Sequence, residues 1–150
     1  ELPAEGLAKA SRGGWRNWSG KGEALKGVEV ADLDPRTRRQ FGKTIGEFQG
    51  VAFQLSRMAI ALENATNLVL KLAWAQRSGR LDARLASIAK LYCAEQATRA
   101  ALAAVQIHGG AGYIWETEIN RLYRAIKLLE IGAGTTEVRK LIIARELLKG

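Results

Sequence analysis

The chain has 150 residues, 47% hydrophobic and 25% charged, a composition that fits one compact domain and excludes a collagen-like or disordered chain. Its one cysteine, Cys93, excludes an intramolecular disulfide and a multi-cysteine zinc site, and we expect it to be a small buried hydrophobic residue. The net charge of +8 favours anionic partners without choosing among phosphates, nucleotides, nucleic acid and acidic protein surfaces.

The N-terminal residues differ from the rest of the chain. The first 50 residues hold both prolines and nine of the 16 glycines, which interrupt any helical period. We expect residues 1–35 to be an irregular, glycine-rich segment in which only residues 25–33 alternate as a short strand would. Residues 36–150 are expected to form one helical domain.

From residue 48 onward, apolar residues recur at steps of three, four or seven, which is the spacing of one face of an α-helix. Gly79, Gly109 and the pair Gly132 and Gly134 supply breaks between helices. Long helices joined by short turns predict an all-α fold, an antiparallel helical bundle of the four-helix type. The four predicted helices cover about residues 48–78, 81–109, 119–129 and 138–148.

The second predicted helix carries a stripe of small side chains, which allows a neighbouring helix to approach closely. With the apolar helix faces, such a stripe could make the chain a non-catalytic helical assembly module that forms a dimer or tetramer. The stripe consists of Ala86, Ala89, Cys93, Ala97, Ala100 and Ala104.

Three clusters interrupt the helical pattern at helix ends, where free backbone groups can meet a ligand. The first covers residues 38–42, with Gln49 behind it. The guanidinium groups of Arg38 and Arg39 can donate to phosphate oxygens, and Phe41 offers a flat face, a combination that suits a nucleotide. A solvated basic turn with a phenylalanine in the core would also account for these residues.

The second cluster, residues 106–113, follows a helix with three glycines, whose backbone N–H groups can approach a phosphate or a partner chain. A simple helix C-cap and tight turn would also account for them. His108 is the only histidine, which excludes a histidine-rich metal site, and we expect it to cap carbonyl groups rather than to act in catalysis. No metal is expected in this chain.

The third cluster, residues 131–137, is a turn of small residues that runs into a helix start. Helix N-termini attract anions through their free N–H groups and their dipole, and the Thr135 hydroxyl can add a donor. Thr135 can instead serve only as the N-cap of the helix. None of the three clusters decides the function by itself.

Together, in this order, the clusters resemble the C-terminal helical domain of the acyl-CoA dehydrogenase family of flavoproteins. The resemblance covers about residues 38–150 and includes the segments RRQFGKTIGEFQ, GRLDARLASIAK, AVQIHGGAGYIWE and INRLYRAIKLLEIGAGTTEVRKLIIAREL. The segment EIGAGTTEVRKLIIAR is similar to the branch that handles short branched acyl groups, of which isovaleryl-CoA dehydrogenase is the best known. The resemblance implies a domain that contributes part of an FAD site and a subunit interface.

The resemblance also implies which residues contact FAD. Arg38 would lie on the pyrophosphate, with Phe48 and Gln49 along the adenosine half. Gln106 and Gly110 would meet the FAD of a neighbouring subunit, so that the cofactor bridges chains. The implied cofactor-binding residues are Arg38, Gln40, Phe41, Phe48, Gln49, Gln106, Gly110, Thr135 and Glu137.

The reaction implied is α,β-dehydrogenation of an acyl-CoA thioester, in which a carboxylate removes the α proton and the β hydride passes to the flavin. Ala133 stands where many members have the catalytic Glu, and alanine cannot take a proton. The isovaleryl-like branch places the base earlier, where ungapped counting reaches Arg12. We nominate neither Glu5 and Glu23 nearby nor Glu130, which should point elsewhere, so the catalytic residue is not identified.

The chain departs from the family in further ways. The family often has Gln where this chain has Glu137, and a carboxylate would repel a pyrophosphate. Ala125 follows an arginine where an Asp is common, which could weaken an ion pair. The two other domains of a complete member are absent, so we expect a truncated, split or frame-altered product that does not turn over alone.

The resemblance implies an acyl-CoA substrate, electron-transferring flavoprotein as the acceptor and a homo-oligomer, and an oxidase-like use of oxygen is the alternative. Nucleic acid is not an expected partner, because Lys and Arg are scattered and no aromatic residues are interleaved with them. No apolar run approaches the roughly 18 residues of a membrane span, and no export signal opens the chain. We therefore expect a cytoplasmic protein.

Overall fold

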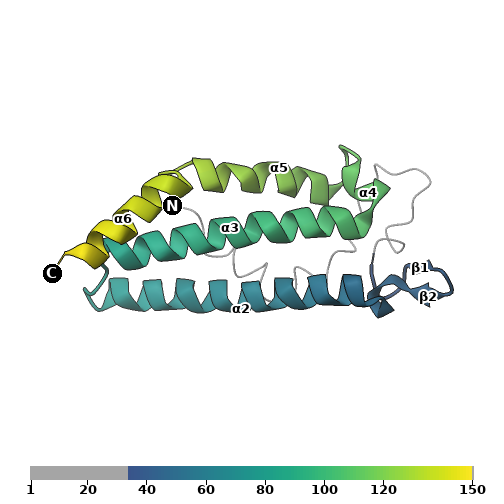
Figure 1. Cartoon of the computed structure of the whole chain (residues 1–150), viewed down its shortest axis with the longest axis horizontal. Helices are drawn as coiled ribbons and strands as arrows, with labels where there is room; N and C mark the ends of the chain where they lie inside the picture. The colour runs from purple at the N-terminus through teal and green to yellow at the C-terminus, as the bar shows by residue number, and fades with distance from the viewer. Residues whose placement is uncertain (1–33, 150) are drawn as a thin grey trace.

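Four long helices account for most of residues 34–149, the part of the chain that the computed structural model describes (Figure 1). The long helices are α2 (Gln49–Arg77), α3 (Ala83–His108), α5 (Glu118–Ile131) and α6 (Thr136–Leu148). The all-α fold is as predicted, but only α2, α3 and α5 alternate in direction, because α6 continues from α5 toward the same end of the molecule instead of turning back (Figure 1). The predicted irregularity of residues 1–33, with the possible strand at 25–33, lies outside the described residues, and the domain boundary at residue 36 stays a prediction.

The turn between α2 and α3 shows why these helices end where they do. Gly79 has a φ of 66°, and its N–H donates to the Gln76 carbonyl at 3.2 Å, while the Arg80 N–H donates to the Ala75 carbonyl at 2.8 Å. These two bonds form a Schellman motif, which closes a helix at a glycine. The Asp82 carboxylate then accepts from the Leu85 N–H at 2.5 Å and starts α3 as its N-cap.

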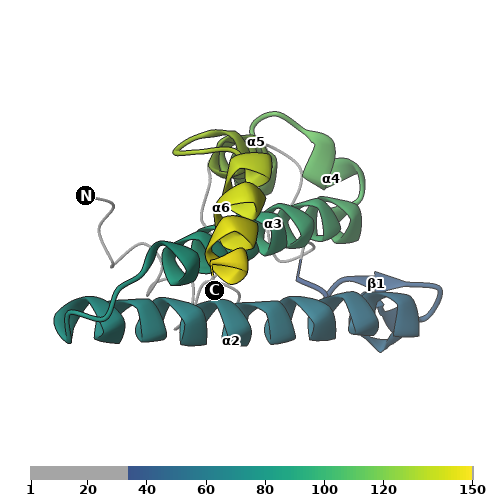
Figure 2. The same ribbon diagram turned by 60° about the vertical axis from the view of Figure 1, so that its left-hand side comes forward.

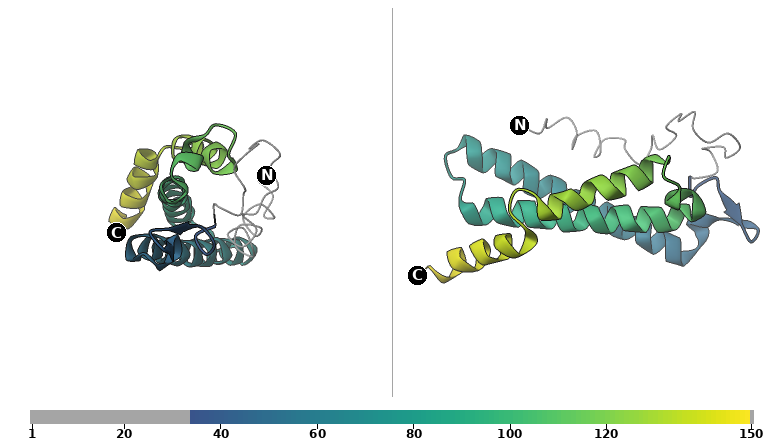
Figure 3. Two further views of the ribbon diagram at one scale, coloured as in Figure 1. Left: turned by 90° about the vertical axis from the view of Figure 1, so that its right-hand side faces the viewer. Right: turned by 90° about the horizontal axis from the view of Figure 1, so that it is seen from above.

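Helix α3 is the centre of the bundle. In the described part of the chain, α2, α5 and α6 each pack most extensively on α3, and α2 and α5 run antiparallel to it along different sides (Figures 1 and 2). Helix α6 follows α5 and then diverges from the bundle axis (Figure 3). The small-residue stripe of α3 is used within this arrangement, because Ala89 and Ala104 are only 3% and 2% exposed. At least these two positions of the stripe therefore serve packing inside one chain.

Small residues dominate the buried core of the described chain, and many large apolar side chains stay exposed. Cys93 is half-buried, and burial raises the pKa of its thiol, which agrees with an unreactive apolar role. No helix among residues 34–149 is long and apolar enough to cross a membrane. Exposed apolar faces of this extent favour association with another protein surface. The exposed apolar residues on the four helices include Phe53, Ile60, Leu70 and Trp74 of α2, Leu102 of α3, Leu128 and Ile131 of α5, and Leu141, Leu147 and Leu148 of α6.

Candidate functional site

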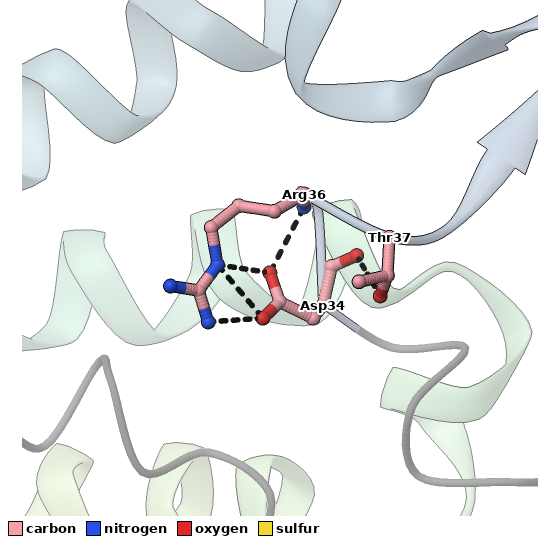
Figure 4. Close-up of polar contacts among 3 residues, drawn as sticks. All are labelled: Asp34, Arg36 and Thr37. Atoms are coloured by element: carbon pink, nitrogen blue, oxygen red, sulfur yellow. Dashed lines mark hydrogen bonds and ion pairs between the residues drawn. The ribbon is translucent and has the colours of Figure 1, made fainter.

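A tight turn leads into the first cluster and fixes where it begins. The Asp34 carboxylate accepts hydrogen bonds from the backbone N–H and the guanidinium of Arg36 (Figure 4). The backbone N–H lies 2.9 Å from Oδ1, and Nε of the guanidinium lies 2.9 Å from Oδ2. The Asp34 carbonyl accepts from the N–H groups of Thr37 and Arg38 at 3.0 and 2.8 Å. Arg36 lowers the pKa of Asp34, so the carboxylate that holds this turn is ionised at neutral pH.

A small β-hairpin, which the sequence did not predict, carries the rest of the first cluster. Strands β1 (Arg39–Gln40) and β2 (Lys43–Thr44) pair antiparallel, and both residues of the two-residue loop have positive φ, 53° at Phe41 and 80° at Gly42. Such a loop is a type I′ turn. Phe41 is 92% exposed and meets Phe48 edge to face, with ring centroids 6.4 Å apart. The alternative interpretation of Phe41 as a core residue is therefore wrong.

The hairpin leads into α2 through a short 3-10 helix, η2 (Ile45–Glu47). The Glu47 carboxylate accepts from both the backbone N–H and the hydroxyl of Thr44, at 3.1 and 2.7 Å, and these bonds lower the pKa of Glu47. The Gly46 N–H donates to the Pro35 carbonyl at 2.8 Å, and a Cβ at Gly46 would lie 2.9 Å from that oxygen. The start of α2 is thereby tied to the turn before the hairpin.

Arg38 joins the first cluster to the second. Its Nη1 atom donates to the main-chain carbonyl of His108, the last residue of α3, at 2.9 Å, and the arginine is half-buried there. A cation at a helix C-terminus also interacts favourably with the helix dipole. One contact thus places residues that are 70 positions apart in the sequence at the same end of the bundle.

The glycines of the second cluster have distinct structural roles. Gly109 has φ 60° and ψ −136°, a conformation that favours glycine, and it ends α3 and begins the short helix α4 (Gly110–Tyr113). A Cβ at Gly112 would lie 2.4 Å from the Val105 carbonyl oxygen, so only glycine lets α4 approach α3 this closely. A Cβ at Gly110 would meet nothing within 4 Å. Gly110 therefore leaves open space at the surface.

Two residues that sequence reasoning missed hold this turn. The Asn120 side chain, from α5, donates to the carbonyl groups of Gly112 and Tyr113 at 3.2 and 3.1 Å. Thr117, buried before α5, donates from its hydroxyl to the Ile114 carbonyl at 2.8 Å. Nothing in the local pattern marks these residues, because their partners are set by the fold of α4 onto α3.

His108 is buried beneath the second cluster. Its Nδ1 atom lies 2.7 Å from the Ala104 carbonyl one turn earlier in α3, and the residue is 5% exposed. Burial, with a smaller contribution from the charge of Arg38, lowers the pKa of His108, so the ring is neutral at pH 7 and Nδ1 donates. The ring caps a carbonyl, as expected.

The predicted FAD-contacting residues of the first two clusters fit an aromatic nucleotide by their chemistry. Gln40, Gln49 and Gln106 present exposed amides, and Phe41 presents an exposed ring. The half-buried Arg38 has five guanidinium N–H donors, one of which is directed to the His108 carbonyl. This end of the bundle can therefore offer phosphate donors, amide groups and a flat apolar face to one ligand.

The third cluster forms a separate structure at the start of α6. Thr135 is the N-cap of α6, and its Oγ1 accepts from the Val138 N–H at 3.3 Å. Lys90 of α3 donates to the Gly134 carbonyl at 2.6 Å, and the Arg139 guanidinium donates to the Ala133 carbonyl. The N-cap role foreseen for Thr135 is confirmed, and its hydroxyl hydrogen is directed to the Glu137 carboxylate.

Carboxylates near the third cluster are ionised. Hydrogen bonds from the Glu137 backbone N–H and from Thr135 lower the pKa of Glu137. Hydrogen bonds from Lys127 and Thr98 lower the pKa of Glu130, whose carboxylate lies 2.5 Å from Lys127 Nζ. A carboxylate with a lowered pKa is a weak proton acceptor, so Glu130 is unsuited to be a general base. Ala133, at the position where the resemblance expects a base in many members, has no carboxylate.

The third cluster does not lie with the other two. The third cluster contacts α3 at Lys90, and the first two meet at His108, where α3 ends. Lys90 and His108 are 18 positions apart on this helix. At 1.5 Å per residue the separation is about 27 Å. Among residues 34–149 no group of three or more His, Cys, Asp or Glu could hold a metal ion.

Comparison with known families agrees with the helical fold. The chain matches the family described as acyl-CoA dehydrogenase, C-terminal domain, over residues 22–148. The chain belongs to this family, and the fold described above is that of its C-terminal helical domain.

The similar proteins are much longer than this chain. It is 44% identical over 128 residues to a probable acyl-CoA dehydrogenase, YngJ, of Bacillus subtilis, covering 82% of this chain and 34% of that protein. It is 45% identical to a mitochondrial isovaleryl-CoA dehydrogenase of Oryza sativa, covering 81% and 30%. The solved FAD complex of PigA superposes with a TM-score of 0.76 at 28% identity, covering 97% and 34%. The chain therefore spans about a third of the length of its relatives.

Proposed function

We propose that this chain is the C-terminal domain of an FAD-dependent acyl-CoA dehydrogenase and contributes part of the FAD site and the subunit interface. The observation that carries the proposal is the Arg38 contact with the end of α3, because it assembles the hairpin and the glycine turn into one surface. That surface offers a guanidinium, exposed amides and the exposed ring of Phe41. The similarity to PigA in its FAD complex supports the same ligand.

The separation of the clusters supports a shared cofactor. Arg38, Phe41 and Gly110 lie at one end of α3, and Thr135 and Glu137 lie about 27 Å away along it. The expectation that Gln106 and Gly110 meet a different FAD from Arg38 is revised here, because Arg38 bonds the end of α3 beside them. We propose instead that each FAD contacts the first two clusters of one subunit and the third cluster of another. The ionised Glu137 accepts hydrogen bonds, so it suits hydroxyl or N–H groups of the ligand rather than its phosphates.

The proposed reaction is α,β-dehydrogenation of an acyl-CoA, for which bound FAD would supply the hydride acceptor. Ala133 cannot take the α proton, and Glu130 is held by Lys127. We propose that the base comes from outside residues 34–149, as in the isovaleryl-like branch. Electron-transferring flavoprotein as acceptor, assembly as a dimer or tetramer and a cytoplasmic location belong to the same proposal.

An FAD titration tests the proposal. The 150-residue chain would be purified, its oligomeric state fixed by light scattering, and FAD binding followed by flavin fluorescence. We expect saturable binding by an oligomer, weakened about tenfold or more in Arg38→Gln through loss of a charge-assisted contact. Arg57→Gln, an exposed arginine on α2, is the matched control and should bind as wild type does. Equal affinities for the two variants would contradict the assigned role of Arg38.

A second candidate function is a non-catalytic helical oligomerisation module. The exposed apolar residues of α2 and α6 favour it, because uncovered apolar faces drive association. This alternative predicts the same oligomer with no saturable FAD binding. Light scattering and the titration together separate the two candidates.

A further inference from the structure

His108 connects three parts of the candidate FAD surface. Its ring bonds the Ala104 carbonyl within α3, and its own carbonyl accepts from Arg38. Its Cβ would lie only 3.0 Å from a Cβ on Gly112, so the residue also supports α4 from below. Any movement of this buried residue would therefore displace Arg38 and the glycine turn together.

The surroundings of His108 make its charge state important. The guanidinium of Arg38 acts on the ring as a like charge, and burial disfavours the imidazolium form. Tyr113 is the one titratable residue of α4, and it is 84% exposed. On α5, Asn120 contacts α4 through an uncharged amide. Glu118 and Arg121 of α5 pair at 3.5 Å, and Arg124 lies over the Trp115 ring. Of the charged groups on the other elements, Glu47 of η2 is bonded to Thr44, and Arg99 of α3 is paired with Glu95.

We infer that His108 is a positioning residue for the Arg38 and Gly110 surface, and that protonation of its ring at acid pH releases this surface and lowers its affinity for FAD. The inference rests on the proposed function for its ligand. It makes the half-site at the end of α3 sensitive to pH, while the third cluster, about 27 Å away, is not affected.

The sign of the effect follows from the lowered pKa. The unfolded or released state binds a proton near the ordinary value of 6.5, more tightly than the folded state does. The neutral ring therefore stabilises the arrangement in which Arg38 bonds the His108 carbonyl at pH values above about 6.5. This contribution is lost as the pH falls through the folded pKa.

The experiment uses the fact that His108 is the only histidine, so its imidazole gives one assignable NMR signal without mutation. We expect His108 to titrate below 6.5 in the chain without FAD, and the Gly109 and Gly110 amide signals to follow the same midpoint. In Arg38→Gln the midpoint should rise, because a like charge is removed. A midpoint at or above 6.5, or one that Arg38→Gln leaves unchanged, overturns the inference.

A second measurement links the ring to the ligand. His108→Gln keeps an N–H donor for the Ala104 carbonyl but does not titrate. Between pH 7 and pH 5, the loss of FAD affinity should be at least about threefold larger in wild type than in His108→Gln. One proton allows at most a tenfold change in affinity per pH unit, so this difference is within its reach. Parallel losses in the two chains overturn the inference. Absence of FAD binding at pH 7 would instead refute the proposed function, while the titration without FAD still decides the coupling of His108 to Arg38.

Discussion

Gly112→Ala tests the packing of α4 on α3 with a single methyl group. The added Cβ would lie 2.4 Å from the Val105 carbonyl oxygen, whereas ordinary contact begins at 3.4 Å. The backbones of α3 and α4 would therefore have to separate by about 1 Å. The carbonyl oxygen and Val105 Cα, at 3.0 Å, belong to the α3 backbone, so no side-chain rotation relieves the clash. Overpacking of this kind costs about 2–3 kcal/mol, the upper part of its usual range. For a chain of this length, Tm should fall by roughly 4–12 °C.

Urea unfolding followed by circular dichroism measures this loss, and the neighbouring glycine supplies the control. A Cβ on Gly110 meets nothing within 4 Å, so Gly110→Ala should stay within about 1 kcal/mol of wild type or exceed it, because alanine favours a helix. Both substitutions lie in the same short helix and add the same atom. Equal free energies of unfolding for the two variants would refute the reasoning from close approach.

Three further substitutions test other turns. Ala133 has a φ of 53°, so Ala133→Gly should raise the free energy of unfolding by about 0.5–1 kcal/mol, whereas Ala144→Gly in α6 should lower it by about 1 kcal/mol in the same urea assay. Thr135→Ala removes the N-cap of α6 and should cost about 1 kcal/mol, while Thr135→Ser should unfold like wild type. Arg36 lowers the pKa of Asp34, so the ionised carboxylate stabilises the fold at pH values above its ordinary pKa of 3.8, and this stabilisation is lost as the pH falls through the lower folded pKa. On acidification, the free energy of unfolding should therefore fall less in Asp34→Asn than in wild type. Parallel curves of unfolding free energy against pH would contradict this.

The long helices were predictable because local chemistry decides them. An apolar period without proline runs through α2 and α3, and the glycines at 79 and 109 carry the positive φ that ends each helix. The helix α4 was missed, since four residues between a glycine cap and a tight turn leave no period to detect.

The hairpin and the assembly of the site depend on contacts between distant residues. Phe41 takes a left-handed conformation that a sequence pattern assigns to glycine or asparagine, so its turn gives no recognisable signal. The individual residues Arg38 and Gly110 could be singled out from their chemistry, but their meeting depends on a bond across 70 positions. Nor could sequence spacing show that the third cluster packs on α3 at a distance from the other two.

The attachment of α2 has a consequence for the rate at which parts of the molecule open. Within the described chain, α2 packs extensively on α3 and η2, and on neither α5 nor α6, whereas α3 is held from several sides. Local opening is easiest where few contacts must break, so backbone amides of α2 should exchange with deuterium faster than those of α3. Covering α2 with a second protein surface should slow its exchange selectively, and this difference would map the assembly face helix by helix.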